Sequence, residues 1–223
     1  MAETNSGNSV GILKLILVPS LITLAVTILR LVGELQNWPA PFFVKQGGGG
    51  GAIVGISWLP IFFGVYFALK LTGAGAGPES LGRTFAFWGL GMLLLVGGGF
   101  LGFSAFRSNS AVEGLAGVAL MAGACIVPLW GWSNLTKVLI AYGYAARIPV
   151  LVVMFLAFQG KWGTHYDAAP PGFVSKGFAS DFLNLAVFPQ MILWIAFTVL
   201  VGTLFGAVAA AIAQRRKPAV QAA

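Results

Sequence analysis

The chain has 223 residues, of which 58% are hydrophobic and only 9% are charged. Soluble domains usually carry about 25% charged residues, so the composition excludes a water-soluble surface and predicts a polytopic membrane protein. The net charge of +7 does not indicate nucleic-acid binding, because the cations are spread over successive loops, where they act as topology signals. The single cysteine, Cys125, excludes an intramolecular disulfide and fits a small side chain at a helix contact.

Long hydrophobic runs predict an all-α bundle of about six membrane-spanning helices. The first run, residues 11–33, is long enough to cross a hydrocarbon core of about 30 Å. No basic segment precedes it, so we expect a retained helix and not a cleaved signal peptide. A polar tail at 1–10 and a basic tail at 214–223 flank one transmembrane domain at 11–213. The other five spans are expected at residues 52–71, 84–106, 111–132, 145–159 and 184–213.

Two segments leave alternatives open. Residues 133–144 either extend the fourth helix or form a short amphipathic segment on the membrane surface. The fifth run is short, so its helix is expected to begin earlier, near Ile140.

In the glycine-rich third span, Gly98 and Gly102 have the spacing that lets two helices approach closely. We expect membrane lipids as partners, and this span or the outer loops are candidate surfaces for a protein partner or a homo-oligomer.

Loop charges predict the orientation in the membrane. Six spans place both termini on one side, and that side receives eight of the 13 cations. Because cytoplasmic loops carry an excess of Lys and Arg, both termini are expected in the cytoplasm, in a bacterial inner membrane. The loop that contains His165 would then face outward.

Polar residues follow one face of the first predicted helix. The intervals between Thr23, Thr27, Arg30 and Glu34 are four, three and four residues, so the four side chains share a face that should point into the bundle. An arginine in a span normally has a partner, and Glu34 stands four residues after Arg30. Either the pair lines a polar cavity that opens outward, or it is an interfacial ion pair at the helix end.

Arg147 begins the fifth predicted span, two residues before Pro149. Since a proline frees a backbone carbonyl in a helix, Arg147 could bind that carbonyl or an anionic lipid headgroup. The preferred interpretation is a headgroup-level anchor, because Tyr142 and Tyr144 beside it are typical of an interface. The alternative is a buried functional arginine.

The loop after the fifth span holds Trp162, His165, Tyr166 and Asp167, and His165 is the only histidine. An imidazole near a carboxylate could serve as a general base, cover a cavity or bind a partner, although a structural role is the preferred interpretation. A zinc site needs about three or four N, S or O ligands, and no nucleophile elbow accompanies the histidine. We therefore expect no cofactor, no metal and no catalytic residue.

No stretch carries the signature of a family of known function. The preferred hypothesis is a non-catalytic scaffold or accessory subunit of a membrane complex. The alternative is a small-solute transporter or channel with an outward-facing polar cavity, and a lipid-active membrane enzyme is less favoured. The hypotheses differ in geometry, since a functional site requires that Arg30 and Glu34 meet His165 or Asp167 at one pocket between helices.

Overall fold

The computed structural model describes residues 11–47, 51–108 and 110–215. In these residues all regular elements are helical and none is a strand, which confirms the prediction of an all-α membrane bundle. The expected tail at 1–10 and residues 216–223 of the expected basic tail lie outside the described residues.

In the described part of the chain, four helical segments are long and apolar enough to cross a membrane. They are α1 (Ile12–Leu35), α3 (Leu81–Ser108), α5 (Leu129–Gly160) and the continuous stretch Phe178–Arg215. Two shorter apolar helices, α2 (Leu59–Gly73) and α4 (Ala111–Ile126), complete the bundle. Their 15 and 16 residues correspond to lengths of about 22 and 24 Å. Each predicted hydrophobic run therefore contains a helix, although only four segments among the described residues reach spanning length.

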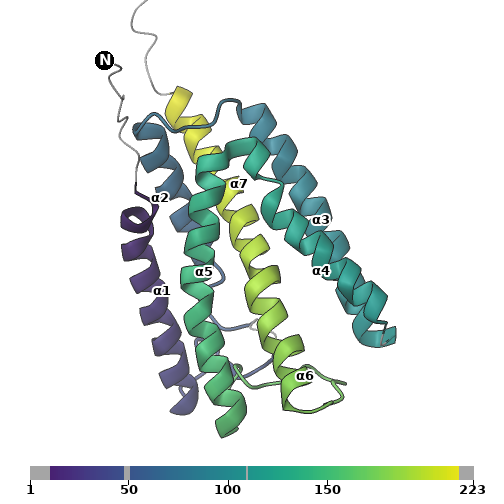
Figure 1. Cartoon of the computed structure of the whole chain (residues 1–223). Coiled ribbons are helices and arrows are strands. Elements are labelled where there is room, and N and C mark those ends of the chain that lie inside the picture. The colour runs from purple at the N-terminus through teal and green to yellow at the C-terminus, as the bar shows by residue number, and fades with distance from the viewer. Residues whose placement is uncertain (1–10, 48–50, 109, 216–223) are drawn as a thin grey trace, which may run out of the picture.

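The helices alternate in direction, as Figure 1 shows. The loop between α1 and α2 and the loop between α5 and α6 (Phe178–Phe182) lie at the same end of the bundle. Helix α7 (Trp194–Arg215) is the central element, because it packs against α2, α3, α4 and α5, while α1 packs mainly against α5. The hairpin of α3 and α4 diverges from the other helices at the end of the bundle where these two loops lie, here called the loop end (Figure 1).

Prolines set several helix boundaries that hydrophobicity alone does not show. The second helix begins at Leu59 with Pro60 in its first turn, and not at Ala52 as predicted, because proline is favoured where the helix needs no N–H donor. Helix α4 ends at Ile126, short of the predicted end at 132. Pro128 then precedes α5, which bends at Trp132.

Residues 133–144 belong to α5 and do not lie on the membrane surface. Leu135, Leu139 and Tyr142 from this segment are buried in the main apolar core, together with Phe67 of α2 and Val199 of α7. The surface-segment alternative is therefore wrong, and so is the extension of the fourth helix, because α4 ends at Ile126. The fifth helix begins at Leu129, well before the expected Ile140. The reason is packing, since this segment provides the apolar face against which α2 and α7 close.

The last apolar run does not form a uniform α-helix. It begins as α6, continues as the π-helical segments η1 (Leu183–Val187) and η2 (Pro189–Leu193), and ends as α7. The preceding loop therefore ends before Phe178, earlier than the expected 183. π-helical turns are rare and are frequent at functional sites, and η2 contains the proline that the sequence places in this run.

Glycines allow close contacts between helices. A side chain at Gly64 of α2 would collide with the backbone of Gly202 in α7. A methyl group at Gly98 would lie 2.8 Å from the carbonyl oxygen of Gly117 in α4. The predicted glycine pair of the third span thus packs inside the chain, against the neighbouring helix of the hairpin.

Candidate functional site

The polar face of α1 points into the bundle. Thr23, Thr27, Arg30 and Glu34 are all buried. The hydroxyls of Thr23 and Thr27 donate to carbonyls one turn earlier, at 2.8 and 3.0 Å. Thr23 Oγ1 also lies 2.8 Å from the hydroxyl of Tyr142 in α5. The predicted spacing therefore produces a continuous polar contact between α1 and the rest of the bundle.

Glu34 joins α1 to the loop that follows α5. Its side chain is fully buried and its Oε1 accepts a hydrogen bond from Arg30 Nε at 2.8 Å. Its Oε2 accepts a hydrogen bond from the backbone N–H of His165 at 2.8 Å, across 131 positions of sequence. The ring nitrogen Nδ1 of His165 lies 2.6 Å from Oε1, without the angle of a well-directed hydrogen bond. One carboxylate therefore holds both a helix arginine and the loop.

Asp167 has a local role. Its carboxylate accepts hydrogen bonds from the backbone N–H groups of Gly163 and Thr164 at 2.8 and 2.7 Å, and from Thr164 Oγ1 at 2.7 Å. These bonds close the turn that presents His165 to Glu34. Trp162 packs against the apolar cluster that includes Met154 and Tyr166. Asp167 and Trp162 therefore shape the loop, and neither lines the cavity described below.

Tyr166 fixes the loop inside the bundle. Its hydroxyl donates to the carbonyl oxygen of Thr27 at 3.2 Å, and its ring lies 3.9 Å from that of His165, centre to centre. Burial raises the pKa of Tyr166 well above its ordinary value. Burial also lowers the pKa of His165, and the nearby Glu34 carboxylate offsets this effect only in part. His165 is therefore neutral near pH 7.

Arg147 lies in the interior of the bundle, contrary to the preferred interpretation as a headgroup-level anchor. Only 5% of the residue is exposed. Its Nη1 donates to Gln190 Oε1 at 3.2 Å, and its guanidinium lies 4.5 Å from the centre of the Trp194 ring. The reason is the length of α5, which extends 18 residues before Arg147 and 13 after it. Within the described part of the chain, no acidic side chain forms an ion pair with this arginine.

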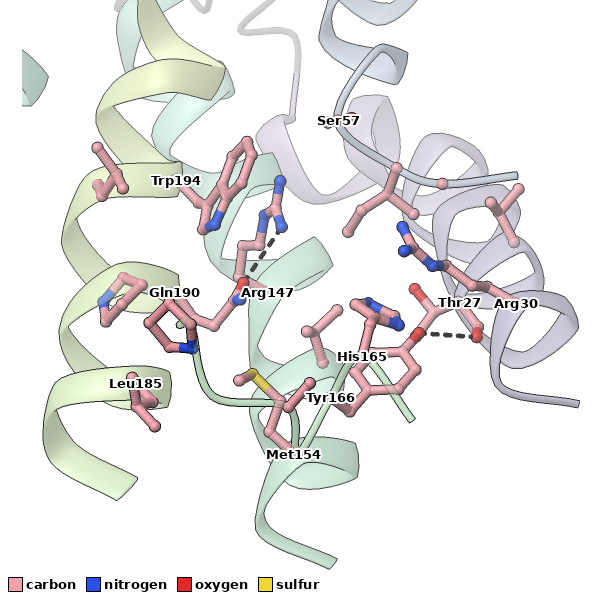
Figure 2. A pocket seen from close by; sticks show the side chains of 18 of the residues that line it. Thr27, Arg30, Ser57, Arg147, Met154, His165, Tyr166, Leu185, Gln190 and Trp194 are labelled. Carbon is pink, nitrogen blue, oxygen red and sulfur yellow. Dashed lines mark hydrogen bonds between the residues drawn. The ribbon is translucent and has the colours of Figure 1, made fainter. Parts of the chain in front are cut away.

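A cavity of about 290 Å³ separates the two arginines (Figure 2). Arg30, His165 and Tyr166 lie together on the side of α1, while Arg147, Gln190 and Trp194 lie together where α5 meets η2 and α7. Apolar side chains complete the wall, among them Val150, Met154, Leu185 and Leu193. Glu34 is not part of the lining, because it lies behind Arg30 and His165.

Three polar lining residues were not predicted: Ser57, Asn184 and Gln190. Gln190 had a usable signal in the sequence, because it is an amide directly after a proline in an otherwise apolar run. Among the described residues, no group of three or more His, Cys, Asp or Glu side chains is placed to hold a metal ion.

The fold and the cavity define a helical membrane protein with a buried, positively charged pocket. No model of a known protein family matches the chain, and neither a curated protein nor a solved structure matches it.

Proposed function

We propose that this protein binds a small organic anion in the central cavity and carries it across the membrane. The observation that carries the proposal is Arg147, a buried arginine that lines the cavity and has no acidic partner among the described residues. At about 1.5 Å per residue, it lies about 27 Å from the start of α5 and about 20 Å from its end. An ionisable residue at such a depth usually marks a substrate or ion pathway.

Electrostatics supports an anion as the ligand. A buried charge without a partner is costly, and its attraction to an opposite charge is strong where the dielectric constant is low. Gln190 supplies one neutral acceptor and Trp194 supplies a ring face, but neither cancels the positive charge. An anion in the cavity would cancel it.

The irregular winding beside the cavity supports transport over static binding. Gln190 belongs to the π-helical segment η2, and Leu185 of the lining belongs to η1. Transporters often place broken or irregular helices at their binding sites, where the packing must change between two states. Arg147 lies nearer to the loop end of α5 than to its start. On the cation count of the sequence, that end faces outward from a bacterial inner membrane.

The convergence of Arg30, Glu34 and His165 supports this proposal over the accessory-subunit hypothesis. An accessory subunit requires only that each polar residue is satisfied locally, as Asp167 is. Here, residues from α1 and from the distant loop meet at the edge of one cavity.

The proposal is tested first by binding. The purified chain is heated with acetate, benzoate, succinate or phosphate, and the midpoint of thermal unfolding is recorded. A ligand at about 100 times its Kd contributes about 2.7 kcal/mol, so at least one anion should raise the midpoint by about 5–11 °C. Arg147→Gln should abolish the shift. Arg83→Gln, which removes an exposed arginine paired with Glu79, is the matched control and should keep it.

Transport is tested with the anion that binds. Proteoliposomes loaded with that anion should exchange it for radiolabelled anion outside, and Arg147→Gln vesicles should not. If no anion shifts the unfolding midpoint, or if Arg147→Gln retains the shift, the proposed site is wrong. If binding occurs without exchange, the protein is a receptor and not a carrier.

A further inference from the structure

We infer that the ligand of this cavity is a small organic monocarboxylate with an apolar body. This inference rests on the proposed function, because it specifies the anion that the Arg147 site accepts. Three features of the cavity carry it: the net charge of the groups around it, the free edge of the Arg147 guanidinium, and the apolar wall next to that edge.

The charged residues that line the cavity, together with the Glu34 carboxylate that pairs with Arg30, carry a net charge of one positive unit. Glu34 neutralises Arg30 through an ion pair of 2.8 Å. Burial lowers the pKa of His165 and so favours its neutral form. Asp167 keeps its negative charge, but it does not line the cavity, and its carboxylate is directed at the backbone N–H groups of the loop turn. Arg147 alone remains uncompensated. A ligand with one negative charge would leave the buried site neutral, whereas a dianion would leave an excess negative charge in a region of low dielectric.

The geometry of Arg147 favours a carboxylate. Its Nη1 is engaged by Gln190 Oε1, and no acceptor in the described residues hydrogen-bonds to Nε or Nη2. These two groups form one edge of the planar guanidinium, with parallel N–H bonds that match the two oxygens of a carboxylate. Because Gln190 uses its oxygen as an acceptor for Arg147, its amide N–H groups remain available as further donors to the ligand.

The wall beside this edge accepts an apolar body. Val150 and Met154 follow Arg147 on α5, and Leu185 and Leu193 face the cavity from η1 and η2. The volume of about 290 Å³ lies at the lower end of ligand pockets, which span about 300–1,000 Å³. A one-ring or short branched acid matches this volume, whereas a lipid with two acyl chains does not.

The test is a calorimetric titration of the purified full-length chain at pH 8 with four probes: benzoate, acetate, succinate and benzamide. Benzoate should bind at least about tenfold more tightly than acetate, because the ring buries apolar surface. It should also bind at least about tenfold more tightly than succinate, which carries two charges. Benzamide, the neutral analogue of nearly the same shape, should not bind measurably.

Two variants separate the contributions of charge and shape. Arg147→Lys keeps the charge and removes the planar edge, so benzoate should bind about tenfold or more weakly. Met154→Gln makes the wall polar and should weaken benzoate more than acetate. If a variant does not fold, the comparison of the four probes on the unsubstituted chain still tests the inference.

A membrane phospholipid with one phosphodiester charge is the other source of a monoanion. The benzoate titration is therefore repeated in nanodiscs of phosphatidylcholine, with and without phosphatidylglycerol. We expect benzoate to bind with equal affinity in both kinds of nanodisc. A tenfold or greater loss with phosphatidylglycerol would assign the site to a lipid headgroup and overturn the inference.

The outcomes distinguish this inference from the proposed function. Arg147-dependent binding in which succinate equals or exceeds benzoate refutes the monocarboxylate class and keeps the anion site. Equal binding of acetate and benzoate refutes the apolar body. The absence of binding by every anion refutes the site itself.

Discussion

Replacement of Glu34 by glutamine should release the loop at residues 161–173 from α1. Glutamine has nearly the same size, but it loses the charge and turns one acceptor oxygen into a donor group. In the structure this carboxylate accepts hydrogen bonds from Arg30 Nε and from the His165 backbone N–H, and it lies beside His165 Nδ1. The substitution therefore leaves the buried Arg30 without its counter-charge. It also places the glutamine amide N–H group against an N–H donor of Arg30 or of His165.

The magnitude follows from the kind of bonds that are lost. Breaking a buried ion pair on one side costs about 3–5 kcal/mol. Glutamine keeps one acceptor, and a hydrogen bond to a charged group is worth about 1.5–3 kcal/mol, so the expected loss is about 2–3 kcal/mol. If the loop opens locally, hydrogen exchange of the His165 amide should accelerate about 30- to 150-fold, since about 1.4 kcal/mol corresponds to a factor of ten.

The assay is hydrogen–deuterium exchange followed by mass spectrometry on peptides that cover the loop. Glu79→Gln is the matched control, because Glu79 is highly exposed and forms a single pair of 3.8 Å with Arg83. It should leave the exchange of the loop unchanged. An intact Glu34→Gln protein whose loop exchanges at the original rate would show that Glu34 does not hold the loop, and the reasoning would be wrong.

Two further predictions concern stability. Burial lowers the folded-state pKa of His165 below its ordinary value of 6.5, so its unfolded form binds more protons in the window between the two pKa values. The stability that neutral His165 provides should be complete above about pH 6.5 and fall as the pH drops through the folded pKa. The unfolding midpoint should therefore decline below pH 6.5, and His165→Gln should flatten that decline; parallel curves would contradict the assignment. Gly98→Val should force α3 and α4 apart, because a Cβ there meets the Gly117 carbonyl at 2.8 Å. We expect a loss of about 1–3 kcal/mol, against little change for Gly99→Val, where a Cβ meets no atom within 4 Å; equal denaturation curves for the two variants would refute the close contact.

The sequence predicted features that depend on neighbours within one helix. The face shared by Thr23, Thr27, Arg30 and Glu34 follows from the helical period, and the ion pair of Arg30 with Glu34 follows from their spacing of four. The all-helical membrane class followed from composition. These features need no knowledge of what packs against the helix.

Features that depend on contacts between residues far apart in the chain were harder to predict from the sequence. The predicted helix start at Ala52 was wrong because the N–H groups of Ile53 and Val54 bond to the carbonyls of Pro41 and Phe42, so an apolar segment lies in a loop. The depth of Arg147 was misjudged because its tyrosine neighbours are typical of an interface, while the depth is set by the full length of α5.

In the candidate site, too, the local features were predictable from the sequence and the contacts between distant residues were not. The sequence left open whether His165 or Asp167 meets the Arg30–Glu34 pair at all, and the preferred accessory-subunit hypothesis implied that they lie apart. The two residues are separated by a single position, and only the turn that Asp167 closes decides that His165 faces Glu34.

The burial of Arg147 also determines how the site should respond to ionic strength. Exposed charges are screened over a Debye length of about 8 Å in physiological salt, and buried charges are screened much less. The exposed pair of Arg83 and Glu79 should therefore weaken when salt is added. An anion held by Arg147 should keep most of its affinity in a concentrated salt whose own ions are too large or too strongly hydrated for the cavity.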